Sequence, residues 1–97
     1  MKNIFYKLAV RGLIARKYPG LVLRDLFWDY DVDEHADKFC IEVEDLASSD
    51  KLTVRTTITI PRQEFGKQRS FLDTAALLLD NLDTVLDWYT KEERHDL

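Results

Sequence analysis

The segment LTVRTTITI, residues 52–60, restricts the fold more than any other part of the sequence. Its side chains alternate with a period of two, which is typical of a β-strand with one buried and one solvated face. The side chains expected on the buried face are Leu52, Val54, Thr56, Ile58 and Ile60. Pro61 is expected to end the strand, because proline has no N–H to donate to a sheet. Such a strand requires partner strands and a layer that covers its apolar face.

Two earlier segments are expected to pair with this strand. Their apolar sides are assigned to Phe39, Ile41 and Val43 in residues 38–45, and to Val22, Leu26, Trp28, Tyr30 and Val32 in residues 21–32. Arg24 interrupts the second pattern. The connections, residues 33–37 and 46–51, are short and polar, which favours antiparallel hairpins.

Helices are expected at both ends of the chain, over residues 3–17 and from Ser70 onward. Ser70 can cap the second helix, and Asp73 suits the positive N-terminal end of the helix dipole. An apolar stripe at helical spacing follows, formed by Phe71, Ala75, Leu78, Leu79, Leu82, Leu86 and Tyr89. The order α-β-β-β-α predicts one α+β domain over residues 1–97. It should be a two-layer sandwich, whose three-stranded antiparallel sheet is covered on one face by two helices.

Composition restricts the function classes. The 97 residues fit one domain, and the net charge of −4 argues against non-specific binding to nucleic acid. Cys40 is the only cysteine, which rules out an internal disulfide and favours a reducing, cytoplasmic location. Lys7 and Arg11 interrupt the apolar run at the N-terminus, and no segment approaches the ~20 apolar residues of a membrane span. We therefore expect a soluble protein with no membrane partner.

The acidic stretch FWDYDVDEH, residues 27–35, raises the question of a metal site or a catalytic site. A calcium loop counted from Asp29 would need glycine at its sixth position and glutamate at its twelfth, where the chain has Glu34 and Cys40. His35 has one other histidine in the whole chain to join it, too few for a typical zinc site. We expect His35 to be a solvated turn residue, and we expect no metal, no cofactor and no enzymatic activity.

The period of two accounts for the acidic residues more simply. Those expected to share the open sheet face are Asp25, Asp29, Asp31, Glu42 and Glu44, accompanied by Lys38 and Arg55. Cys40 is expected on the same face. Such a surface favours docking to a protein partner that is itself basic, and it also fits an ordinary solvated face.

The first helix has apolar residues on two sides. One side holds Ile4, Phe5, Leu8, Gly12 and Ala15, and the other holds Tyr6, Val10, Leu13 and Ile14. One side can cover the sheet, and the second needs the other helix or a partner chain, which includes a second copy. In the last helix Leu77 and Trp88 lie off the main stripe, and an exposed tryptophan is typical of protein interfaces.

These features predict a small non-enzymatic interaction protein, such as a regulator, an adaptor or an inhibitor. The residues predicted to bind a protein partner are Asp29, Asp31, Glu42, Glu44, Tyr6, Val10, Leu77 and Trp88.

The basic residues before the last helix favour an alternative function. Arg62, Lys67 and Arg69 lie near a helix N-terminus, where cations and backbone N–H groups can bind anions. The element order and the stretch GKQRSFLDTAALLLDNL, residues 66–82, resemble the double-stranded-RNA-binding domain. That resemblance implies that Lys67 and Arg69 would contact phosphates. The alternative is therefore a nucleic-acid-binding module that uses Arg62, Lys67 and Arg69.

Overall fold

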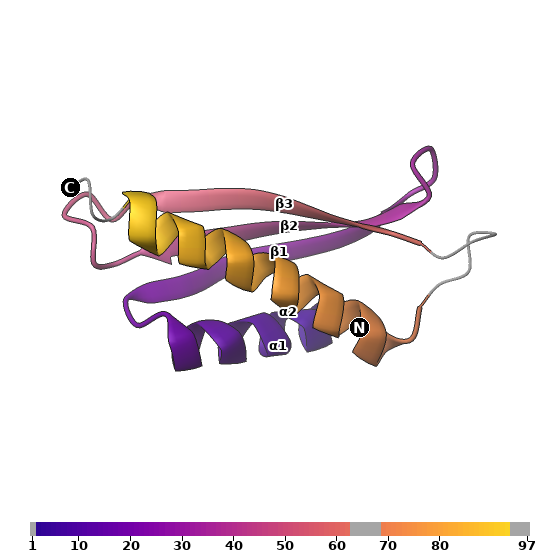
Figure 1. Cartoon of the computed structure of the whole chain (residues 1–97), viewed down its shortest axis with the longest axis horizontal. Helices are drawn as coiled ribbons and strands as arrows, with labels where there is room; N and C mark the ends of the chain where they lie inside the picture. The colour runs from indigo at the N-terminus through magenta and orange to yellow at the C-terminus, as the bar shows by residue number, and fades with distance from the viewer. Residues whose placement is uncertain (1, 63–68, 94–97) are drawn as a thin grey trace.

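The structure, a computed structural model, describes residues 2–62 and 69–93. Its elements are α1 (Lys2–Lys17), β1 (Leu21–Asp31), β2 (Ala36–Asp45), β3 (Thr53–Pro61), α2 (Phe71–Trp88) and a short π-helical turn, η2 (Tyr89–Glu93). The strands form one antiparallel sheet in the order β1-β2-β3. Both helices pack on the same side of this sheet, as Figure 1 shows. The predicted α-β-β-β-α order and two-layer architecture are confirmed.

A β-bulge in β1 explains the irregular pattern of that strand. Leu23 pairs with Val43 and Asp25 pairs with Glu42, so Arg24 is an extra residue without its own partner on β2. Before the bulge the odd-numbered residues face the helices, and after it the even-numbered ones do. The assignment of Val22 to the inner face is therefore wrong, and its side chain is 37% exposed. The assignment of Val32 is wrong for another reason, because Val32 follows the last residue of β1 in the hairpin turn and is 67% exposed.

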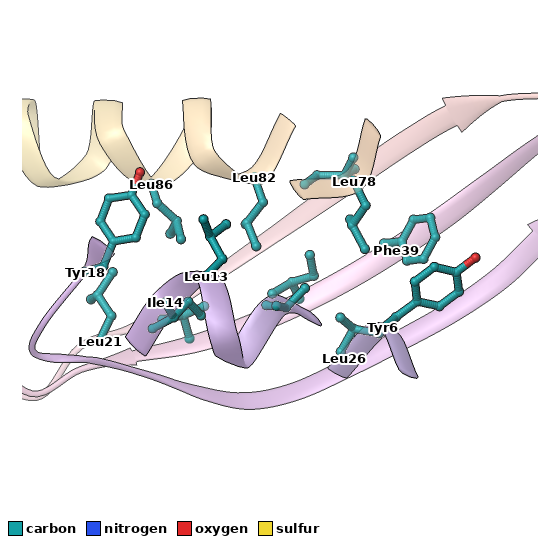
Figure 2. Close-up of a cluster of buried hydrophobic side chains, with 14 of the residues drawn as sticks. Tyr6, Leu13, Ile14, Tyr18, Leu21, Leu26, Phe39, Leu78, Leu82 and Leu86 are labelled. Atoms are coloured by element: carbon teal, nitrogen blue, oxygen red, sulfur yellow. The ribbon is translucent and has the colours of Figure 1, made fainter. Parts of the chain in front are cut away.

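The core lies between the helices and the inner face of the sheet, as Figure 2 shows. Its main side chains are Tyr6, Val10, Leu13 and Ile14 from α1, Leu26, Phe39, Ile41, Val43, Ile58 and Ile60 from the sheet, and Leu78, Leu82 and Leu86 from α2. Each such burial stabilises the fold by about 1.5–3 kcal/mol. Leu52, expected in this set, precedes β3 and is 45% exposed.

The two helices contact each other near both ends. At their N-terminal ends the rings of Phe5 and Phe71 lie 5.8 Å apart, edge to face. At the other ends, Nζ of Lys17 lies 2.7 Å from Oδ2 of Asp83, and the Tyr18 hydroxyl donates to the backbone carbonyl of Asp83 at 2.9 Å. These contacts fix the helix layer as one surface.

Local signals in the sequence account for the ends of the elements. The backbone N–H of Asp73 donates to the Ser70 hydroxyl, so the predicted cap of α2 is confirmed. Gly20 has a φ of 96°, a conformation that favours glycine and that turns the chain from α1 into β1. Asp45, fully buried at the end of β2, accepts a hydrogen bond of 2.7 Å from the hydroxyl of Tyr89 in η2.

Neither helix of the described chain is long and apolar enough to cross a membrane.

Candidate functional site

The outer face of the sheet is the surface that the sequence singled out. It is the face opposite the helix layer, and no described segment covers it. Read across β1, β2 and β3, its rows are Asp25, Glu42 and Arg55, then Phe27, Cys40 and Thr57, then Asp29, Lys38 and Thr59. Alternation thus brings the predicted acids of β1 and β2 together on one face.

Most of these acids are paired with a cation. Oε1 of Glu42 lies 2.9 Å from Nε of Arg55, and Glu44 accepts a hydrogen bond from Arg24. Around the β1 edge, Oδ1 of Asp25 lies 3.5 Å from Nζ of Lys7 in α1. The bulge is what places Arg24 beside Glu44, so this cation was not predicted. The face is an alternation of signs with an acidic excess, and Arg24 adds a third cation to the Lys38 and Arg55 that were expected there.

Asp31 holds the hairpin between β1 and β2. Its Oδ1 accepts the backbone N–H groups of Asp33 and Glu34 at 3.0 and 3.1 Å. Its Oδ2 lies 3.0 Å from Nζ of Lys38. The hydrogen bond from Lys38, followed by the one from the Glu34 backbone, lowers the pKa of Asp31, and Asp31 in turn raises the pKa of Lys38. The role of Asp31 within the chain is therefore to shape the turn.

Asp29 differs from its neighbours. Its Oδ1 accepts the backbone N–H of Tyr30 at 2.8 Å, but it forms no ion pair with any residue of the described ranges. The exposed Asp33 and Glu34 follow in the turn, and on the outer face Lys38 is the cation nearest to this end in the strand register. The excess of negative charge therefore gathers at the hairpin end of the sheet.

Phe27 lies near the middle of β1, an edge strand, on the outer face of the sheet. Its side chain is 60% exposed, and its strand pairs with β2 on one side only. A hollow of about 450 Å³ lies over it, lined also by Asp25, Cys40, Glu42, Arg55 and Thr57. Phe27 was missed as a site residue, although its parity with Asp25 and Asp29 already placed it on the outer face.

The four apolar residues predicted to bind a partner do not join this face. Tyr6 and Val10 are 1% and 0% exposed, so the prediction that they are available to a partner is wrong. They lie on the side of α1 that packs against the sheet. Leu77 and Trp88 are 37% and 56% exposed, but they belong to α2 on the opposite layer.

The residues of the nucleic-acid alternative are mostly engaged within the molecule. Arg62 lies 3.0 Å from the buried Asp37 and stacks 3.6 Å above the Tyr30 ring, with its own side chain 14% exposed. Its guanidinium already has a carboxylate partner, which argues against the predicted role of Arg62 as a phosphate ligand. Arg69 donates to the backbone carbonyl of Pro61. Lys67 lies outside the described residues.

Groups that could support metal binding or nucleophilic chemistry lie apart. Among the described residues, no three of the His, Cys, Asp and Glu side chains form a group that could hold a metal ion. Nδ1 of His35, in the hairpin turn, lies 3.2 Å from the Tyr30 hydroxyl. Cys40 is exposed in the middle of β2. At the rise of a β-strand it lies about 13 Å along the strand from Ala36, the residue that follows His35, so the thiol and the imidazole are far apart.

Comparison of the chain with protein-family models, with curated proteins and with solved structures found no match.

Proposed function

We propose that this chain is a small, non-enzymatic interaction protein that binds a protein partner through the outer face of its sheet. The observation that carries the proposal is the exposed ring of Phe27 in a hollow that extends from β1 across β2 to β3 on that face. A single exposed aromatic side chain in a β-strand costs the fold little stability, so its exposure alone does not indicate a binding site. A hollow around it supplies the concave apolar contact that an anchoring side chain of a partner requires.

The surroundings of Phe27 have the anatomy of a protein interface. An apolar centre is ringed by polar side chains, among them Glu42 and Arg55, whose ion pair holds both in place before any partner arrives. Side chains that are already ordered lose less conformational entropy on binding. The polar rim is therefore ordered before binding, which supports recognition of a protein partner by this face.

The charge of the face indicates the chemistry of the partner. The strands contribute five outward acids and three outward cations, which are Asp25, Asp29, Asp31, Glu42 and Glu44 against Arg24, Lys38 and Arg55. Asp29 has no cation partner in the described chain, and it lies next to Phe27 on the outer face. A partner segment with an apolar side chain flanked by basic residues would fit both features. Charges at a rim mainly raise the association rate and the salt dependence of binding.

The test has two stages. Affinity capture from the native host identifies a partner, and calorimetry with that purified partner then compares variants. We expect Phe27→Ala to weaken binding by about 2 kcal/mol or more, which is about thirtyfold. Asp29→Lys should slow association and flatten its salt dependence.

The controls are exposed residues away from the outer face. Trp88→Ala removes an aromatic side chain of similar exposure from the opposite layer, 56% against 60% for Phe27. Asp50→Lys reverses an exposed charge in the β2–β3 turn. Both variants should bind normally. Normal binding by Phe27→Ala, or a loss with Trp88→Ala alone, would show that the outer face is not the contact surface.

A further inference from the structure

The outer side of the helix layer exposes a continuous set of apolar side chains, here called the helix-layer patch. It consists of Ile4, Phe5 and Leu8 on α1, exposed by 60%, 54% and 55%, and of Phe71 and Leu72 on α2, exposed by 36% and 76%. Ile4 and Leu8 are one helical turn apart, and the contact between the Phe5 and Phe71 rings joins the two helices. The patch therefore spans both helices near their N-terminal ends.

This patch is larger than isolated exposed residues explain. Five large side chains, each between a third and three quarters exposed, present apolar surface on the order of several hundred Å², the range that marks interaction sites. Further along the same side of α1, a Cβ added at Gly12 would meet no atom within 4 Å, so α1 offers an open surface beyond Leu8. Within the described chain nothing covers this side.

Charges of opposite sign flank the patch on its two helices. Arg11 on α1 and Asp80 on α2 are exposed, and neither forms an ion pair with a residue of the described ranges. This contrasts with Lys7 and Lys17, whose ammonium groups contact Asp25 and Asp83. Arg16 on α1 and Asp73 on α2 are likewise exposed without an ion pair in the described ranges, so the free cations belong to α1 and the free carboxylates to α2.

We propose that the helix-layer patch binds the same patch of a second copy of this chain. In a two-fold symmetric pair, each contact between two residues occurs twice with the roles exchanged. Placing α1 on α2 of the second copy brings apolar side chains together and sets Arg11 opposite the acidic side of α2. Placing α1 on α1 would bring cations together, and placing α2 on α2 would bring carboxylates together. The surface is thus complementary to itself in one arrangement.

The pair does not depend on the proposed binding of a partner by the sheet, because the two surfaces lie on opposite layers. Phe27 and Asp29 remain exposed in such a pair. Loss of dimerisation and loss of partner binding are therefore separate measurements on separate variants.

Light scattering after size-exclusion chromatography tests the proposal. The wild-type chain should approach twice the 11.4 kDa of a single chain as its concentration rises. Leu8→Asp and Leu72→Asp should raise the dissociation constant at least about tenfold, since each places a charge within the apolar contact. The matched control is Leu46→Asp, because Leu46 is 48% exposed in a turn away from the patch, and this variant should dimerise normally.

Two charge-reversal variants, measured alone and as a mixture, test whether the molecule bound at the helix-layer patch is a second copy of this chain. Arg11→Glu alone and Asp80→Lys alone should each be monomeric, because like charges then face each other twice. An equal mixture of the two should dimerise, since opposite charges meet at both contacts. A wild-type chain that stays monomeric into the upper micromolar range overturns the proposal. A mixture that dimerises no better than either variant alone also overturns the proposal. Circular dichroism must show that all variants are folded.

Discussion

The guanidinium of Arg62 lies 3.0 Å from the carboxylate of Asp37, and both side chains are largely shielded from solvent. Asp37 lies near the start of β2, and Arg62 directly follows the end of β3. The same guanidinium stacks on the Tyr30 ring of β1, so this single residue contacts all three strands or their ends. The ion pair holds together the end of the sheet that carries the acidic hairpin.

Removing one member of this pair should destabilise the fold strongly. Arg62→Ala leaves the buried Asp37 carboxylate without its cation, which we expect to cost about 3–5 kcal/mol of unfolding free energy. Arg55→Ala is the matched control, because its side chain is 82% exposed and also pairs with a carboxylate. That variant should lose at most about 1 kcal/mol. Urea denaturation measures both, and equal small losses would contradict the structural role of Arg62.

The stability contributed by Asp83 should depend on pH in the acid range. Hydrogen bonds from Lys17 and then from Tyr18 lower the pKa of Asp83 below its ordinary value of about 3.9. A carboxyl group with a lowered pKa in the folded state stabilises the fold above the unfolded-state pKa. That contribution is lost as the pH falls through the folded-state pKa.

Asp83→Asn should therefore reduce stability at neutral pH, and the difference from the wild type should shrink as the pH falls below about 4. Thermal unfolding followed over this pH range measures the effect. Asp80→Asn, which removes an exposed carboxylate from the same helix, controls for the loss of one charge. A difference between wild type and Asp83→Asn that stays constant across the range would contradict the prediction.

The bulge in β1 predicts where the strand tolerates a deletion. Without Arg24, Leu23 and Leu26 are separated by Asp25 alone, so simple alternation keeps both leucines inside. Deleting Arg24 should therefore preserve the fold, with the loss of one ion pair to Glu44. Deleting Asp29 instead reverses the faces of the residues on one side of the gap. We expect that second deletion to unfold the chain, as seen by circular dichroism, and similar stability of the two proteins would disprove the bulge assignment.

Binding to duplex RNA provides a test of the nucleic-acid alternative. We expect no binding to a generic RNA duplex even at low salt, since Arg62 is paired and the outer sheet face carries an acidic excess. Fluorescence anisotropy across a salt series measures this. Binding with a steep salt dependence that Lys67→Glu and Arg69→Glu abolish would instead establish the alternative.

Regular alternation allowed most of the sheet to be predicted. In β2 and β3 each residue has one partner in the neighbouring strand, so parity alone placed Phe39, Ile58 and Glu42 on the correct faces. In β1 the same rule failed at Val22, because a bulge adds a residue without a distinctive sequence signal. Arg24 interrupted the pattern, and that interruption was the only sign.

The contacts that decide which surfaces are free could not be predicted. Both sides of α1 are apolar, so the sequence did not show that Tyr6 and Val10 would face the sheet while Phe5 would stay exposed. Ion pairs between strands depend on register and on how far a side chain reaches. The neutralisation of Glu44 by Arg24 therefore became visible only with the strands in place.

The one-sided arrangement of the helices has a consequence for how this protein could act. A pair of chains joined through their helix layers carries two sheet faces on its outside, turned in opposite directions. Such a pair is a bivalent ligand. When two target sites lie within its span, engagement of one raises the local concentration of the other face, so the avidity of the pair exceeds the affinity of a single chain.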